Sequence, residues 1–209
     1  MVFNKGQRPA GSARGEQQWK TSYRNPLDSE SNMNDEWKIK QIETRPPLKE
    51  YPDPILRRTA LPVADVCKSV RALLRGMARI MYNREGIGLA APQIGVMKRL
   101  IIADIGEGLL SLINPEILDR RGEAFLLEGC LSLPNVGVKV TRNESIVVRG
   151  IDTAGREVTR DLSGLMARVI QHEIDHLNGV LILDYGPTEN LHELKMLPQE
   201  LQCDRKIRL

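Results

Sequence analysis

A helix with two histidines on its apolar side is the feature that most constrains how this chain folds. His172 and His176 lie four residues apart, with Glu173 directly after the first. Because four residues make just over one helical turn, both imidazoles project from one face and can bind a single metal ion. Glu173 lies about 100° further round the axis, where a carboxylate can take the proton of a metal-bound water. The pattern predicts a hydrolytic metal site.

The residues before the histidines extend the same stripe into a buried helix. Leu165, Val169, His172 and His176 are spaced by four, three and four residues, which places them on one side of a helix. Burying imidazole nitrogens without partners costs on the order of a few kcal/mol, so both rings need partners. A pair of hydrogen-bonded core histidines is the alternative to a metal site. On this helix Ile170, Ile174 and Leu177 widen the buried face, and Arg168, Gln171 and Asp175 form a polar strip.

A catalytic metal site of this kind needs a third protein ligand and an open position for water. Metzincin proteases place that ligand six residues after the second histidine, but Ile182 stands at this position. Cys130 is the better candidate, because it follows an apolar run at residues 125–127 that predicts a buried strand. A buried structural cysteine is the alternative for Cys130. Three downstream acids lie in no apolar stripe and are predicted to be surface charges: Glu189, Glu193 and Glu200.

A third segment, residues 85–95, is rich in glycine and alanine. Gly86 and Gly88 suit an extended backbone that lies close against another chain. Gln93 carries a side-chain amide that can donate a hydrogen bond to an oxyanion. The segment is informative only together with the cysteine and histidine segments.

In this order, the three segments resemble the signature of the peptide deformylases. That family is marked by Gly-x-Gly-Leu-Ala-Ala-x-Gln, Glu-Gly-Cys-Leu-Ser and Gln-His-Glu-x-Asp-His-Leu, which stand without a mismatch at residues 86–93, 128–132 and 171–177. Three ordered motifs arise by chance far less often than one. The resemblance covers about residues 48–185. It implies an enzyme that removes the N-formyl group from the N-terminal formyl-methionine of nascent polypeptides and releases formate.

The resemblance also assigns the metal ligands. Cys130, His172 and His176 would hold one divalent metal, which in this family is iron(II) in the cell, with zinc(II), nickel(II) or cobalt(II) able to occupy the same site. A thiolate ligand makes the metal a weaker Lewis acid than an all-nitrogen set does. We infer that such a site suits the unhindered formyl carbon and spares internal peptide bonds.

The remaining roles follow from the same resemblance. Glu173 would be the general base and then the acid that protonates the leaving amine, and Gln93 with the backbone N–H of Leu131 would stabilise the oxyanion. The glycine segment would pair with the incoming peptide as an added strand. For Leu165 and Val169, plain core packing is the alternative. The expected substrate-binding residues are Gly86, Ile87, Gly88, Leu126, Glu128, Leu165 and Val169.

Composition and net charge indicate which kinds of partner the protein is expected to have. No run of 18 apolar residues predicts a membrane span, and a net charge of +3 without a basic helix gives no reason to expect direct nucleic-acid readout. Three scattered cysteines suit a reducing, cytoplasmic compartment. We expect a monomer that acts on formyl-methionyl nascent peptides, with a contact to the ribosome near the exit tunnel as a further expectation. Two other function classes are a zinc metallopeptidase on the same helix and a non-catalytic binder of formylated chains.

The predicted fold class is α+β, with antiparallel β-sheets packed around a central helix that carries the HExxH metal motif. An amphipathic helix is predicted over residues 63–83, with Cys67 on its core side, and a short helix over residues 188–196. For Glu85 and Arg142, a partly buried pair and a solvated surface position are equally open. Short strands are predicted at residues 99–104, 123–127, 136–140, 145–150 and 157–161.

Three regions divide the chain. Residues 1–45 are expected to be a disordered extension, residues 46–196 the catalytic domain and residues 197–209 a polar tail. Residues 1–27 hold five Lys or Arg against one acid, with few apolar residues. An organelle transit peptide is a second interpretation of this extension, and a natural start at Met33 is a third.

Overall fold

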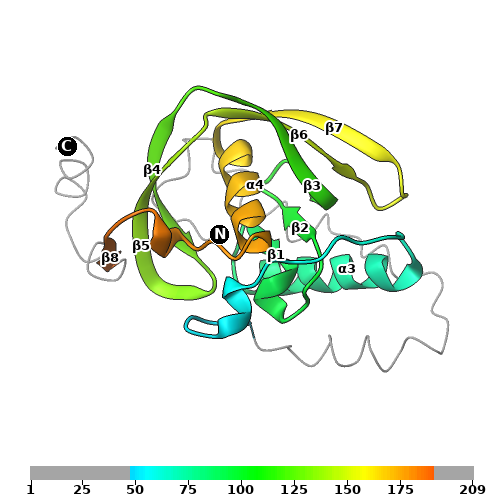
Figure 1. Ribbon diagram of the computed structural model, residues 1–209, viewed down its shortest axis with the longest axis horizontal. Helices are drawn as coiled ribbons and strands as arrows, with labels where there is room; N and C mark the ends of the chain where they lie inside the picture. The colour runs from blue at the N-terminus through cyan, green and yellow to red at the C-terminus, as the bar shows by residue number, and fades with distance from the viewer. Residues whose placement is uncertain (1–47, 191–209) are drawn as a thin grey trace.

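The structure, a computed structural model, describes residues 48–190 as two antiparallel β-sheets with two α-helices between and beside them (Figure 1). One sheet has five strands in the order β1-β2-β3-β6-β7, and the other has three in the order β4-β5-β8. Every strand pairing is antiparallel. The mixed α/β fold with antiparallel sheets is therefore confirmed. The elements are α3 (Lys68–Asn83), β1 (Gly88–Ala90), β2 (Leu100–Ala103), β3 (Leu110–Arg121), β4 (Ala124–Cys130), β5 (Leu133–Arg142), β6 (Ser145–Ile151), β7 (Glu157–Ser163), α4 (Gly164–Leu177) and β8 (Thr188–Asn190).

Helix α4 lies between the two sheets, with β4 and β5 on one side and the strands of the larger sheet on the other (Figure 1). Of its 14 residues, 11 are buried, so the helix has no solvated face and its polar side chains must find partners inside the protein. Its apolar residues pack on the five-stranded sheet; this cluster includes Ile170 and Ile174 from the helix and Ile101, Leu112, Ile146 and Val148 from the sheet. Burial on both sides fixes where α4 presents each side chain.

Helix α3 packs against β1 and β2, where Leu74, Met77 and Met81 join Leu89, Leu100 and Ile102 in a second apolar cluster. The predicted start at residue 63 is wrong, because the helix begins at Lys68 after an extended Cys67. Val63 is held away from the helix by both its backbone groups, which hydrogen-bond to the Asn114 side chain at 2.8 Å each. Cys67 is exposed rather than buried in the core. Neither of the two described helices is long and apolar enough to cross a bilayer.

Strand β3 is the longest strand, yet the apolar pattern predicts no element there. Its sequence contains Asn114 and Pro115, residues that usually interrupt strands. The structure accommodates both in a bulge: Asn114 adopts a positive φ of 51°, and the pairing with β6 shifts register between Ile113 and Glu116. The Asn114 amide then reaches Val63. A bulge of this kind bends a strand and redirects a side chain without ending the pairing.

The chain after α4 also departs from the prediction. Residues 188–190 form β8, paired with Val136–Val138 of β5, so the predicted helix from residue 188 is wrong at its start. An edge pairing satisfies backbone groups through a partner distant in sequence, which local helix propensity does not report. The rest of that helix, the extension at residues 1–45, the start at Met33 and the tail at residues 197–209 lie outside the described residues.

Gly179, just after α4, gives a test of this packing. It adopts a φ of +74°, and a Cβ there would lie 2.5 Å from the carbonyl oxygen of Arg57. Because backbone atoms cannot move aside cheaply, we expect Gly179→Ala to lower the free energy of unfolding by about 2–3 kcal/mol in urea denaturation.

Gly155→Ala is the matched control, since Gly155 has a similar φ of +86° but a Cβ there would meet only Val66 at 3.9 Å. That variant should lose about 1 kcal/mol from backbone strain alone. Equal losses in the two variants would contradict the close contact between Gly179 and Arg57.

Candidate metal centre

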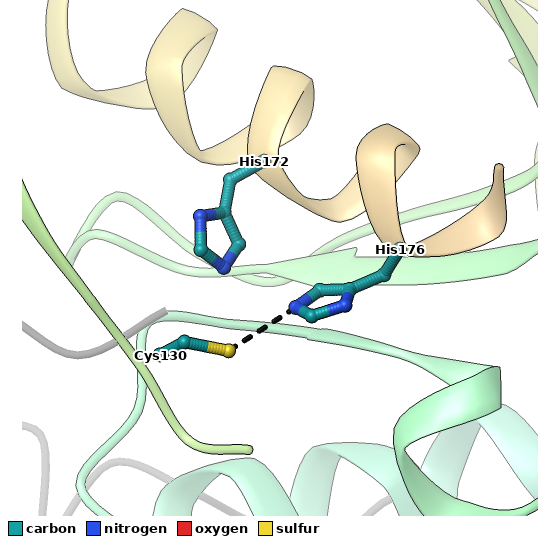
Figure 2. Close-up of side chains that lie close together, drawn as sticks. All are labelled: Cys130, His172 and His176. Carbon is teal, nitrogen blue, oxygen red and sulfur yellow. Dashed lines mark hydrogen bonds between the residues drawn. The ribbon is translucent and has the colours of Figure 1, made fainter. Parts of the chain in front are cut away.

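Cys130, His172 and His176 converge from two separate elements of the fold. Cys130 ends β4, and both histidines lie on α4. One possible ligand atom from each residue lies within 4.8 Å of the others, and the Cys130 Sγ is 3.2 Å from His176 Nε2. The sulfur and the two rings face a common point (Figure 2). The structure thus brings together the cysteine and the two histidines that the sequence nominated as a set.

The three side chains fit a bound metal ion. All are nearly inaccessible to solvent, at 4%, 2% and 2% exposure, and His172 Nε2 has no hydrogen-bond partner among the described residues. Figure 2 shows this nitrogen directed toward the gap between the cysteine sulfur and His176. A buried ring nitrogen without a partner is costly unless a bound ion or another non-protein group occupies the gap. One thiolate and two imidazoles suit a divalent transition metal, and three protein ligands leave a further position open. The alternative of two fully hydrogen-bonded core histidines does not fit.

The local charges favour a thiolate. Burial alone raises the pKa of Cys130, but the charge of His176, its hydrogen bond to the sulfur and the nearby imidazole of His172 outweigh burial and hold the pKa well below its ordinary value. Burial alone lowers the pKa of His172, but the nearby Cys130 sulfur and the hydrogen bond to Glu128 raise it to about 9. Cys130 and His172 therefore stabilise each other's charged form. The thiolate is the form that binds metals.

Glu128 lies behind His172, where its side chain is completely buried. Its Oε2 is 2.9 Å from His172 Nδ1, and its carboxylate also accepts hydrogen bonds from Arg142 and Arg168. Burial opposes its charge, but the hydrogen bonds from His172 and Arg142 lower its pKa to about 2. Of the two alternatives for Arg142 and Glu85, the partly buried pair is wrong, because Arg142 pairs with Glu128 and Asp175 and Glu85 is exposed.

Glu173 is buried beside the glycine segment. A Cβ placed on Gly88 would lie 2.3 Å from Glu173 Oε1 and 2.7 Å from Val169 Cγ1, so strand β1 and helix α4 touch at this glycine. Ile87 and Leu165 pack at the margin of the apolar cluster that contains Val169. Of the other expected substrate-binding residues, Gly86 is buried and Leu126 is half-buried on β4.

The amide of Gln93 is oriented by its neighbours. Gln93 lies on the short helix η3 (Ala91–Ile94), and its Oε1 accepts the backbone N–H of Ala90 at 2.8 Å. Its Nε2 donates to Ser132 Oγ at 3.1 Å and points toward Cys130 Sγ at 3.7 Å. The donor end of the amide therefore faces the metal-binding residues. Leu131 follows Cys130 in the turn after β4.

The sequence analysis missed four of the side chains that surround the site. Ser132 fixes the Gln93 amide, and its only signal was its place in the Glu-Gly-Cys-Leu-Ser segment. Arg142 and Arg168 both pair with Glu128, and Asp175 pairs with Arg142. Arg168 and Asp175 were noted only as part of a polar strip, and Arg142 was considered only with a different partner. Their true partners are 14 to 40 residues away in sequence, so no local pattern reports them.

Comparison with known proteins decides the family. The sequence model of the polypeptide deformylases matches residues 46–191. This chain belongs to the polypeptide deformylase family. The peptide deformylase of Thermodesulfovibrio yellowstonii is 45% identical over 142 residues, which cover 66% of this chain and 86% of that protein. The peptide deformylase of Carboxydothermus hydrogenoformans is 49% identical over 135 residues, covering 65% of this chain and 89% of that one.

Solved structures of the deformylase family share the fold. The crystal structure of peptide deformylase from Thermotoga maritima is 41% identical, with a TM-score of 0.66, and covers 68% of this chain and 97% of that chain. The peptide deformylase from Synechococcus elongatus, solved in complex with actinonin, is 43% identical with a TM-score of 0.66 and covers 72% of this chain and 82% of that one. The resemblance inferred from the three sequence segments is confirmed.

Removal of the sulfur tests the metal centre. We expect Cys130→Ala to weaken cobalt(II) binding by at least about 10²-fold and to abolish thiolate-to-cobalt absorption in the near ultraviolet, because the site loses its only anionic ligand. Titration of the apoprotein under anaerobic conditions measures both effects.

Cys67→Ala is the matched control, since Cys67 is exposed and lies at the start of α3. It should bind cobalt as the parent does. A Cys130→Ala protein that kept the parent's affinity and absorption would show that the sulfur is not a ligand.

Proposed function

We propose that this protein hydrolyses the N-formyl group of formyl-methionyl nascent polypeptides and releases formate. The observation that carries the proposal is the buried cluster of Cys130, His172 and His176 with Glu173 beside it, in a chain of the deformylase family. A zinc metallopeptidase on the same helix is not favoured. Its usual downstream ligand position holds Ile182, an apolar core residue at 3% exposure, whereas an upstream cysteine lies next to the histidines.

The proposed ligands for one divalent metal are Cys130, His172 and His176. Iron(II) is the proposed ion in the cell, with zinc(II), nickel(II) and cobalt(II) as ions that the same donor set accepts. When bound, the ion polarises the formyl carbonyl and lowers the pKa of a water so that hydrolysis proceeds near neutral pH. The same proposal places the HExxH motif on α4, at the centre of the fold.

The proposed proton carrier is Glu173. Its buried carboxylate takes a proton from the attacking water and later gives it to the amine that leaves. This role requires the carboxylate to stay close to the reacting carbon, and the absence of a side chain at Gly88, where a Cβ would lie 2.3 Å from Oε1, leaves room for it there. Gln93 Nε2 and the N–H of Leu131 are the proposed oxyanion donors, each worth about 3 kcal/mol in comparable acyl-transfer sites.

The proposed peptide-binding edge is β1. It is one of the two edge strands of the five-stranded sheet, paired on one side with β2, and an extended peptide can add to such an edge through main-chain hydrogen bonds. Gly86 and Gly88 let the peptide backbone approach closely. For the methionine side chain we propose a pocket formed by Ile87, Leu126, Leu165 and Val169. Glu128, which the sequence analysis counted among the substrate-binding residues, is instead proposed to hold His172.

The setting of the reaction is part of the proposal. A catalytic domain over residues 46–196 agrees with the family match at residues 46–191. A thiolate ligand survives in a reducing compartment, which supports the cytoplasm. The substrate is a chain that has just been synthesised, which supports action near the ribosomal exit tunnel. We further propose that the protein acts as a monomer.

The proposal is tested by Glu173→Gln in the metal-loaded protein. We expect about one equivalent of metal in parent and variant, but formate release from a formyl-methionyl peptide reduced about 10²–10⁴-fold in the variant, because the amide cannot carry the proton. Glu107→Gln, at an exposed loop acid, should match the parent. Cleavage of internal peptide bonds by the parent without formate would show a peptidase, and binding of the peptide without any turnover would show a non-catalytic binder.

Gly88→Ala tests the contact between β1 and Glu173. A methyl group at this position would overlap Glu173 Oε1 at 2.3 Å and Val169 Cγ1 at 2.7 Å, so the carboxylate must move. We expect kcat for formate release to fall by at least about 10²-fold with metal content unchanged. Gly106→Ala, where no atom lies within 4 Å, should keep the parent's kcat. An active Gly88→Ala enzyme would show that Glu173 need not stay where the structure places it.

A further inference from the structure

A buried charge network joins the metal-binding residues to the surface of the protein. Its centre is Glu128, whose Oε1 accepts Arg142 Nε and Arg168 Nη1 at 2.7 Å each. Its Oε2 accepts Arg142 Nη2 at 3.0 Å and lies 2.9 Å from His172 Nδ1. The two arginines are only 5% exposed and Glu128 is 0% exposed. Four N–H groups therefore saturate one carboxylate that solvent does not reach.

These bonds determine which nitrogen of His172 carries the proton. Guanidinium groups can only donate hydrogen bonds, and a carboxylate held by two of them can only accept. His172 Nδ1 must then be the donor to Glu128 Oε2. A neutral imidazole with its proton on Nδ1 has its lone pair on Nε2, and this nitrogen is the one that faces Cys130 and His176 (Figure 2). Glu128 thus selects the ring form that can bind a metal.

Glu128 is itself held in place by an outer group of side chains. Arg142 Nη1 donates to Asp175 Oδ2 at 2.8 Å, and the Tyr185 hydroxyl donates to the same oxygen at 2.8 Å. The Arg142 guanidinium carbon also lies 5.1 Å from the centre of the Tyr185 ring. Because the guanidinium is planar, the bond to Asp175 fixes the plane in which Arg142 meets Glu128. Tyr185 is 42% exposed, so the network ends at the surface.

The same network ties together the elements that supply the ligands. Arg168, on α4, donates to the carbonyl oxygen of Val140 at 2.9 Å and to that of Ala124 at 2.5 Å. Ala124 begins β4, which ends at Cys130. The arginine therefore fixes the helix that carries the histidines against the hairpin that carries the cysteine.

We propose that Arg142, Asp175 and Tyr185 are positioning residues for the metal centre, which act through Glu128 to hold His172 in the orientation and ring form that bind the metal. The inference rests on the metal site proposed above. Tyr185 thereby gains a role at the metal centre although it does not touch His172. It acts through Asp175, Arg142 and Glu128. A purely structural network would contribute to folding but would leave the properties of the bound metal unchanged.

Graded variants separate the two roles. Arg142→Lys removes the bidentate hydrogen bonding to Glu128. Asp175→Asn removes the charge opposite Arg142, and Tyr185→Phe removes only the hydroxyl group. Tyr82→Phe is the matched control, because Tyr82 also donates to an aspartate, Asp104 Oδ2 at 2.6 Å, but does so between α3 and the end of β2. Each full-length variant is loaded with cobalt(II). The readouts are the rate of cobalt loss to excess chelator, the visible absorption spectrum and the melting temperature of the apoprotein.

We expect cobalt loss to accelerate about 10–100-fold in Arg142→Lys, about 10-fold in Asp175→Asn and about 3-fold in Tyr185→Phe. The visible bands should shift in the same order, since the orientation of His172 changes the ligand field. Tyr82→Phe should match the parent in both readouts even if its melting temperature falls. Should Arg142→Lys fail to fold, Asp175→Asn and Tyr185→Phe still decide the question.

The inference is overturned if Asp175→Asn and Tyr185→Phe keep the parent's spectrum and lose cobalt within two-fold of the parent rate, whatever their melting temperatures. Failure of the proposed function is distinguishable from this result. A parent protein that binds no cobalt, or that binds it and releases no formate, contradicts the function. A parent that does both, with variants indistinguishable from it, contradicts only the positioning role.

Discussion

Helix α4 and the β4–β5 hairpin meet at Glu128, and the placement of the candidate metal ligands depends on that contact. The hairpin carries Cys130 and the helix carries both histidines, so the three side chains converge only while the two elements stay in register. The helix and the hairpin are joined by a buried carboxylate between two buried arginines. Such a contact tolerates little change, because a buried charge that loses its partners strongly destabilises the protein. The geometry leaves little freedom, since every N–H and oxygen has a fixed direction. Precision of placement, more than added stability, is what this contact gives the site.

Much of the site could be predicted because its reactive side chains lie in short segments of the sequence. The four-residue spacing of His172 and His176 places two candidate ligands on one helix face, and Gly88 and Gln93 lie in one short stretch. The third ligand needed an argument by elimination, since Cys130 is distant in sequence from both histidines. The three ordered segments then indicated the deformylase family, which the comparisons confirm. The stripe from Leu165 to His176 also predicted that this segment is a helix, and it lies within α4.

The remainder depended on contacts that no window of sequence contains. Strand β3 was missed because Asn114 and Pro115 normally interrupt strands, and only the bulge and the bond to Val63 explain their presence. The early start expected for α3 failed at the same bond. Arg168 and Asp175 could be placed on α4, but their partners lie on β4 and β5 and beyond the helix. Polar residues on a buried helix are a sign that such partners exist, although the sequence does not say which they are.

The proposed site depends on one coordination sphere, formed by the Cys130 sulfur and the imidazoles of His172 and His176. X-ray absorption spectroscopy of the zinc(II)-loaded, full-length protein measures this coordination sphere directly, because sulfur and nitrogen ligands lie at different distances from the metal. We expect one sulfur at about 2.3 Å and two imidazole nitrogens at about 2.0–2.1 Å from each zinc ion, with one lighter ligand in addition. A spectrum without a sulfur ligand, or with fewer than two imidazoles, would contradict the convergence of Cys130, His172 and His176 on a single ion.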